Sequence, residues 1–417
     1  MKRTFVSLVC GIACTSLAMA QQWQGYAPAL PATVDTSSQS APPVLQGYTP
    51  TLPSTVDTSS QSTLPVLTLP MWIYSATASA ALGGGAYSGR MIGRSPYDRG
   101  KATITIPVQI VPLVITIDNG NGDRVTYDPT AVDPCISPGA HTDVDMVANS
   151  PLFTNSNWTM NGISVGNTQF VDAFQRAEFW SLLGGTSYHL LFTPSTLAAQ
   201  SLSFGSAGVR GPGGNYNAAT QFGGCGKIGV VNQTNMNTAI VNLITGPLAG
   251  LVNVGTFPIF LTNNVVMASS GASMSSNCCV LGFHSEFING TNLQIYAPVS
   301  LNTAGVFSSD ISTLSHEMTE AINDPTGANA TPSWGNIGEI VGQCRSNLEV
   351  GDPLSPGFGT PTNGFTMVGA NGLTYHLQEL AFYSWYYGGP SLGAGGKYSS
   401  NGTFSGSAKL CPAGGTN

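Results

Sequence analysis

Charged residues are scarce in this chain. Asp, Glu, Lys and Arg make up only 8% of its 417 residues, and 13 cations against 20 carboxylates give a formal net charge of −7. A protein that binds nucleic acid needs a basic surface for the phosphate backbone, and so few cations cannot supply one. The composition therefore argues against nucleic acid as a partner.

The apolar run at the start of the chain is short. Residues 5–13 are apolar and follow two basic residues, but they are fewer than the roughly 20 that a membrane-spanning helix needs. The small-x-small sequence Ala18-Met19-Ala20 is typical of a cleavage site. Residues 1–20 are therefore predicted to be a signal peptide, with a membrane anchor and a lipoprotein linked at Cys14 as the alternatives. We expect a secreted protein with no integral membrane segment after cleavage, in the extracellular space, the periplasm or at the cell surface.

Cysteines are few, and their spacing does not suit a metal site. Six follow the signal peptide: Cys135, Cys225, Cys278, Cys279, Cys344 and Cys411. An even number in an oxidising compartment predicts three disulfides, with 15 pairings open. No Cys-x-x-Cys spacing supports a zinc–thiolate site. The adjacent Cys278 and Cys279 are expected to bond to different partners.

A tandem repeat follows the signal peptide. Residues 24–45 recur almost unchanged as residues 46–67, and both copies are rich in Pro, Ser and Thr with almost no charge. Two copies are too few for a solenoid. Residues 21–70 are predicted to form an extended linker, with a strip that binds a cell wall or a partner as the alternative. The folded domain is expected over residues 71–417.

The domain mixes strand and helix patterns. A strand over 102–117, a tight turn at 118–123 and a strand over 124–127 are predicted first. An amphipathic helix is predicted over 167–180, with Asn167 or Thr168 as its cap. Further strands are predicted over 188–192, 228–231, 257–261 and 293–298, and a helix over 236–248. This order predicts an α+β fold with a mixed β-sheet, long loops and stabilising disulfides.

One further helix has clear boundaries, over residues 311–323. Asp310 is predicted to cap its first amides, and Pro325 ends it because proline lacks an amide donor. The apolar residues fall at helical spacing and predict a buried stripe: Ile311, Leu314, Met318, Ala321 and Ile322.

This helix carries the residues best suited to chemistry. His316 and Glu320 are one turn apart, so they can share a metal ion. Glu317 projects in a neighbouring direction, where it can act as general base on a metal-bound water without being a ligand. The usual zincin motif has His in place of Glu320, but carboxylate oxygen also binds zinc. The extra negative charge should make the bound water less acidic. A solvated, charged helix face is the alternative.

A third ligand is expected from the carboxylates downstream. Glu349 is the first choice, because the segment Glu349-Val-Gly-Asp352 can fold back over the helix and Gly351 permits a tight turn. Asp352 is either a ligand or a partner that holds His316. Glu339 is the alternative third ligand.

Two other histidines have open roles. His284 lies before a predicted strand, where a packed, hydrogen-bonded histidine is favoured over a functional one. His376 either stabilises an oxyanion in the site or is a strand residue beside the aromatic core.

The sequence Ser315-His-Glu-Met-Thr-Glu-Ala-Ile-Asn-Asp-Pro325, followed by Glu349-Val-Gly-Asp352, resembles a motif of the phosphate-induced (EXORDIUM-like) secreted proteins and related exported bacterial proteins. Gly282-Phe-His-Ser285 is similar to a Gly-Tyr-His stretch of that group. The resemblance covers about residues 278–385. It implies a zincin-like fold, metal ligands at His316, Glu320 and Glu349, and Glu317 as base. This chain departs from the group because Glu349 lies farther from the helix and Asp352 is not followed two residues later by Cys.

The sequence thus predicts a secreted, zinc-dependent hydrolase, peptidase-like, that acts on an extracellular protein or peptide. A non-catalytic extracellular or cell-wall protein that retains the metal helix for structure is the alternative. A third hypothesis is a carbohydrate-binding module. Trp and Tyr residues favour it, but the sequence contains no motif specific to such modules.

Overall fold

The computed structural model describes residues 68–98, 103–118, 124–205, 216–219, 226–273, 276–289, 292–305, 307, 310–335, 337–338, 342–355 and 364–411. The predicted signal peptide and linker lie outside these residues. The described chain is α+β, mostly strands with a few helices, as the sequence predicts. None of the helices in these ranges has the length and apolar character that crossing a membrane requires.

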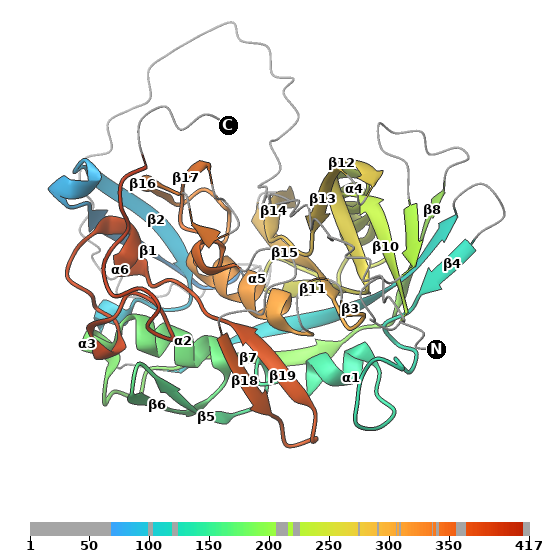
Figure 1. Cartoon of the computed structure of the whole chain (residues 1–417), viewed down its shortest axis with the longest axis horizontal. Coiled ribbons are helices and arrows are strands. Elements are labelled where there is room, and N and C mark those ends of the chain that lie inside the picture. The colour runs from blue at the N-terminus through green and yellow to red at the C-terminus, as the bar shows by residue number, and fades with distance from the viewer. Residues whose placement is uncertain are drawn as a thin grey trace, which may run out of the picture.

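A seven-stranded mixed sheet is built around one long strand, which crosses the molecule in Figure 1. This strand is β3 (Ile104–Asp118). Parallel neighbours are β7 (Leu190–Thr196), β8 (Gln200–Gly205) and β11 (Phe257–Asn263), and β4 (Arg124–Tyr127) is antiparallel. Beyond β11 lie the parallel β15 (Asn292–Leu301) and the antiparallel edge strand β14 (Ser285–Asn289).

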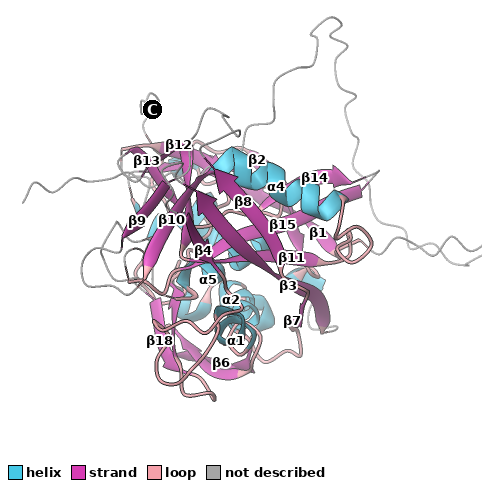
Figure 2. Ribbon diagram, turned by 90° about the vertical axis from the view of Figure 1, so that its right-hand side faces the viewer, coloured by secondary structure: helices cyan, strands magenta, loops and turns pink. Residues whose placement is uncertain are grey.

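Helices cover both faces of this sheet. Along β3, Ile106, Val108 and Ile110 pack in one apolar core with α2 (Phe170–Glu178) and α5 (Ser312–Asn323). Val111, Leu113, Ile115 and Ile117 pack in a second core with α4 (Gln233–Thr245). Successive strand residues point to opposite faces, so the two cores lie on opposite sides. Figure 2 shows α4 and α2 on either side of the strands.

Smaller units complete the fold. A four-stranded sheet contains β13 (Ser276–Val280), β12 (Val265–Ser273), β10 (Lys227–Asn232) and β9 (Tyr216–Ala219) in that order. Antiparallel pairs are formed by β1 (Met71–Thr77) with β2 (Ala86–Ile92), β5 (Ser156–Met160) with β6 (Ile163–Thr168), β16 (Ala330–Gly335) with β17 (Cys344–Asn347), and β18 (Gly364–Val368) with β19 (Thr374–Gln378). The short helices are α1 (Asp143–Ala148), α3 (Trp180–Leu183) and α6 (Tyr383–Tyr387).

Most predicted elements are confirmed, with shifted boundaries. The strands predicted over 228–231, 257–261 and 293–298 are parts of β10, β11 and β15, and the segment 188–192 overlaps β7. The helix predicted over 167–180 is divided into α2 and α3. Its predicted cap is wrong: Gln169 is the N-cap and makes no side-chain cap, because the Thr168 hydroxyl donates to Asp172 instead, at 2.7 Å.

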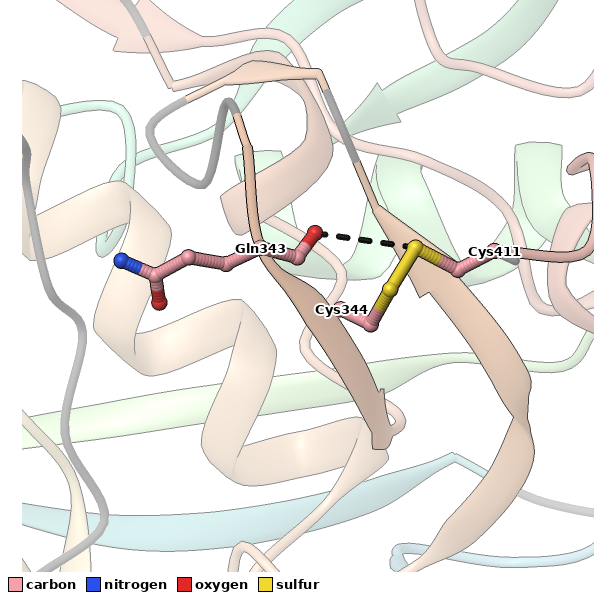
Figure 3. Close-up of a disulfide and its surroundings, with 3 residues drawn as sticks. All are labelled: Gln343, Cys344 and Cys411. Atoms are coloured by element: carbon pink, nitrogen blue, oxygen red, sulfur yellow. Dashed lines mark hydrogen bonds between the residues drawn. A yellow bond between two sulfur atoms is a disulfide. The ribbon is translucent and has the colours of Figure 1, made fainter. Parts of the chain in front are cut away.

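One disulfide links residues that are far apart in the sequence, and another links two neighbours. Cys344 of β17 is bonded to Cys411 near the C-terminus, and Cys411 Sγ contacts the carbonyl oxygen of Gln343 at 3.8 Å (Figure 3). The prediction of different partners for Cys278 and Cys279 is wrong, because these two are bonded to each other. Both side chains are buried in one small apolar cluster. Cys135 is also disulfide-bonded, and Cys225 lies outside the described residues.

Candidate metal centre

The helix predicted over 311–323 is α5. It ends at Asn323 ahead of Pro325, as predicted, but the predicted cap is wrong, because Ile311 is the N-cap and makes no side-chain cap. Asp310 has a positive φ of 29°. Its Oδ1 accepts from the amides of Ile311 at 2.6 Å and His376 at 2.9 Å, and its Oδ2 lies 2.5 Å from His376 Nδ1. The carboxylate therefore binds the amide of Ile311, just ahead of the first turn, and β19, and it does not reach the amides of the first turn itself.

All of α5 is buried, including its polar residues. The predicted apolar stripe is fully inaccessible at every position. His316, Glu317 and Glu320 are only 8%, 5% and 3% exposed, because the helix packs against β2, β15 and β19. The alternative prediction, a solvated and charged helix face, is therefore wrong. Buried ionisable groups need a partner, either another charge or a metal.

The tautomer of His316 follows from its neighbours. Its Nδ1 lies 3.1 Å from Gln378 Oε1 and 3.4 Å from Ser355 Oγ. Gln378 Nε2 donates to the carbonyl of Gly351 at 2.7 Å, which fixes the amide with its oxygen toward the imidazole. His316 therefore donates from Nδ1. Its Nε2 lies 3.0 Å from Glu320 Oε2 and is the nitrogen that can lose its proton to a metal ion.

His284 has the same arrangement. It precedes β14, and its Nε2 donates to the carbonyl oxygen of Asp324 at 2.8 Å. Its Nδ1 lies 3.5 Å from Glu317 Oε2 and 3.7 Å from Glu320 Oε2, without a well-directed hydrogen bond to either. Glu349 Oε2 lies 3.8 Å from Nε2. The histidine that the sequence favoured as packing is therefore buried among the site carboxylates.

Glu320 is oriented by the downstream segment. Its Oε1 accepts from the amides of Gly351 at 2.9 Å and Asp352 at 3.3 Å. The segment therefore folds back over the helix, as predicted. Gly351 itself has φ −86° and ψ −37°, which any residue can adopt, so it is not needed for a tight turn. A Cβ there would lie 2.3 Å from His316 Nδ1, so glycine is needed for close approach.

The carboxylates of the downstream segment flank the two histidines. Glu349 accepts from Asn347 Nδ2 through Oε1 at 2.7 Å, while its buried Oε2 has no hydrogen-bond partner among the described residues. Asp352 Oδ1 lies 3.5 Å from His316 Nε2, and its Oδ2 pairs with Arg345 at 2.8 Å. The alternative third ligand, Glu339, lies outside the described residues.

Glu317 lies between the two histidines. One of its oxygens is 4.0 Å from His316 Nε2 and the other is 3.5 Å from His284 Nδ1. Gly282 leaves room for this side chain, since a Cβ there would lie 2.9 Å from Glu317 Cγ.

Burial and mutual charge shift the titration of these groups. Burial disfavours the charged form of His284, but the carboxylates of Glu317 and Glu320 outweigh it and raise its pKa to about 9. The pKa of His316 is raised well above its usual value, against its burial, mainly by Glu320. Burial raises the pKa of Glu317, and burial and the charge of Glu320 raise that of Glu349 well above its usual range. The cluster therefore holds protons that a cation would replace.

The cluster fits a metal ion. Two sets of donor atoms lie within 4.8 Å of one another, namely His316, Glu317 and Glu320, and His284, Glu320 and Glu349. Each histidine donates its outer N–H to an oxygen, which is how ligating histidines are held in metalloproteins. His284 Nδ1 and Glu349 Oε2 are buried and lack hydrogen-bond partners among the described residues. These buried His and Glu groups can therefore hold a metal ion.

His376 lies on β19, two residues before Gln378. Its Nδ1 is bound by Asp310, and its side chain is 34% exposed. The hydrogen bond that His376 donates to Asp310 raises the pKa of His376. Among the described residues, the hydrogen-bond partner of its ring is Asp310, just ahead of α5, and not a cluster carboxylate.

No family model, curated protein or solved structure matches this chain. The function must therefore be argued from the cluster itself.

Proposed function

We propose that this chain is a secreted, zinc-dependent hydrolase with a zincin-like domain that cleaves peptide bonds. The zinc is held by His316 and Glu320, with Glu349 and Asp352 as the nearest further carboxylate donors. Glu317 is the general base, and the substrate is an extracellular protein or peptide. The sequence resemblance to the EXORDIUM-like secreted group implies the same ligands and base.

The orientation of the histidines carries this proposal. One ring nitrogen of each histidine donates to an oxygen, namely Nδ1 of His316 and Nε2 of His284. The other ring nitrogen, Nε2 of His316 and Nδ1 of His284, faces carboxylates. Nitrogen and carboxylate oxygen at these positions form a donor set that suits zinc. The choice of zinc rests on this chemistry and on the resemblance.

The protein residues have distinct tasks in this proposal. Bound zinc would act as a Lewis acid on the scissile carbonyl and lower the pKa of a water molecule. Glu317 takes a proton from that water, and its burial, which raises its pKa, favours proton uptake near neutral pH. Gln378 holds His316 in the tautomer with a free Nε2. His376 is placed to donate to the oxyanion if the substrate lies along β19.

One observation favours a structural metal instead. The side chains of His284, Glu317, Glu320 and Glu349 are at most 7% exposed. Structural zinc sites are closed by protein ligands, whereas catalytic sites keep one position open. A non-catalytic extracellular protein with a metal-stabilised helix is therefore the second candidate function.

The two candidates are separated by Glu317→Gln. For the enzyme, wild type contains zinc by elemental analysis and cleaves peptides from a mixed library, while the variant retains zinc and is slower by about 10²–10⁴-fold. Zinc without any cleavage supports the structural role. If the variant cleaves peptides as fast as wild type, Glu317 is not the general base.

Glu178→Gln is a matched control. Glu178 is also fully buried, but its carboxylate accepts from Tyr383 and Gln175, outside the cluster. This variant should keep both the zinc and the activity of wild type.

A further inference from the structure

We propose that the cluster holds two divalent cations bridged by Glu320, with His316 on the first ion and with His284 and Glu349 on the second. This inference rests on the proposed metal-dependent function and adds a second ion to it. The dinuclear site would place the reaction among two-metal hydrolyses, in which one ion polarises the carbonyl and both position the attacking water.

The two histidines belong to different sets of donor atoms. One set contains His316, the other contains His284, and both contain Glu320. A nitrogen or oxygen ligand lies roughly 2.0–2.2 Å from zinc, so each set has the compactness that one ion requires. One ion beside His316 and a second beside His284 account for both histidines, for Glu320 and for Glu349, and Glu317 is the one member of the two sets that is left as base.

Glu320 is positioned to bridge. Its Oε1 is occupied by the amides of Gly351 and Asp352. Its Oε2 faces both histidines, at 3.0 Å from His316 Nε2 and 3.7 Å from His284 Nδ1. One oxygen that lies near a ring nitrogen of each histidine is placed as a bridging carboxylate would be.

The second set contains the atoms that the first ion would leave without partners. His284 Nδ1 and Glu349 Oε2 are both buried and lack hydrogen-bond partners among the described residues. Their residues are only 8% and 5% exposed. Unpartnered buried polar atoms are costly. The two residues belong to one set of donor atoms, and Glu349 Oε2 lies 3.8 Å from the His284 ring, so a second cation beside both residues would be favoured.

The charge of the cluster also favours two ions. Five buried carboxylates interact electrostatically here, those of Glu317, Glu320, Asp324, Glu349 and Asp352, and Arg345 is paired with one of them. One divalent ion together with Arg345 leaves two of the five negative charges, whereas two divalent ions together with Arg345 balance all of them.

Glu317 keeps its role as base in this arrangement. Its Oε1 faces His316 and its Oε2 faces His284, so the carboxylate lies beside the space between the two ions. A water held between them would be within reach of this carboxylate.

The test is a metal titration of full-length protein, as purified and after chelation and reloading with Zn²⁺ or Co²⁺. We expect two ions per chain by elemental analysis, and a metal–metal distance of roughly 3.5–4 Å by X-ray absorption. His284→Ala should lower the content to one ion, and Glu320→Gln should lower the affinity for both. His189→Ala, which removes a histidine outside the cluster, should leave two.

The outcomes are distinguishable. One ion per chain in wild type, with no metal–metal scattering, overturns the dinuclear site and leaves the proposed hydrolase standing. No ion overturns both. Because the stoichiometry is measured on wild type, a His284→Ala variant that fails to fold does not affect the result.

Discussion

The backbone amide of Gly351 donates to Glu320 Oε1 at 2.9 Å. This bond joins a segment 31 residues downstream to α5 and leaves Glu320 Oε2 facing the histidines. The position of the downstream segment therefore fixes the direction of a carboxylate that is proposed to bind metal.

Gly351→Ala tests this close approach. The new Cβ would lie 2.3 Å from His316 Nδ1, so either the segment or the imidazole must move. We expect a loss of about 1–3 kcal/mol in the free energy of unfolding and weaker zinc binding, measured by urea denaturation and by chelator competition. Gly389→Ala is the control, because a Cβ there meets nothing within 4 Å. Equal affinity in Gly351→Ala and wild type would contradict the geometry.

Metal removal should destabilise the fold. Without a cation, buried carboxylates of the cluster repel one another, and the binding free energy of the metal is lost from the native state. We expect EDTA to lower the Tm of wild type by on the order of 5–10 °C in calorimetry. Glu320→Gln removes the donor common to both sets, so its Tm should respond little to EDTA. An equal response in both proteins would show that the metal binds elsewhere.

The sequence predicts the helix of this site better than the site itself. Residues His316, Glu317 and Glu320 are found because helical spacing links neighbours in sequence to neighbours in space. Gln378 is 62 residues from His316, and no local pattern joins them. His284 is isolated in the sequence, and an isolated histidine more often packs in a core than binds a metal. Only the resemblance of Gly282-Phe-His-Ser285 connects it with the helix.

The errors in the fold have a similar cause. Asp310 has the right residue type for a cap, but its carboxylate is used by His376, 66 residues away. Thr168 donates its hydroxyl to Asp172, only four residues away, and so does not cap the helix either. Other side-chain hydrogen bonds override capping preferences here, whereas apolar patterns, as in β3 and α5, survive because burial needs no specific partner.

Glu178 should make stability fall as pH rises. Burial raises its pKa from 4.5 to about 8, although the amide of Tyr383 opposes this. Between these values the folded state binds a proton that the unfolded state has released, so the stabilisation present below pH 4.5 is lost as the pH approaches 8. Glu178→Gln cannot ionise. Its advantage over wild type should grow by a few kcal/mol between pH 5 and pH 8.

Urea denaturation of both proteins at pH 5, 6.5 and 8 measures this difference. Other groups titrate equally in the two proteins, so only Glu178 contributes to the change in their difference. Parallel stability curves over this range would show that Glu178 ionises normally.

The disulfide between Cys344 and Cys411 should stabilise the C-terminal segment. It closes a loop with a sequence separation of 67, and the loss of loop entropy in the unfolded chain corresponds to about 4 kcal/mol. Cys411→Ser should lose this amount in urea denaturation. The double variant Cys344→Ser/Cys411→Ser should lose the same, because either change opens the loop. A larger loss in the double variant would indicate that the side chain of Cys344 stabilises the fold by packing as well as through the disulfide.

His376 should matter to turnover if substrate lies along β19. Removal of one oxyanion donor typically lowers kcat by about 10²–10³-fold, so His376→Gln should lower kcat while the zinc content stays that of wild type. His189→Gln is a matched control. Its side chain is 33% exposed against 34% for His376, and its Nδ1 is bound by Asp172 at 2.7 Å. If both variants turn over peptide at the wild-type rate, His376 is a strand residue held by Asp310, and the oxyanion must be stabilised by the metal ion alone.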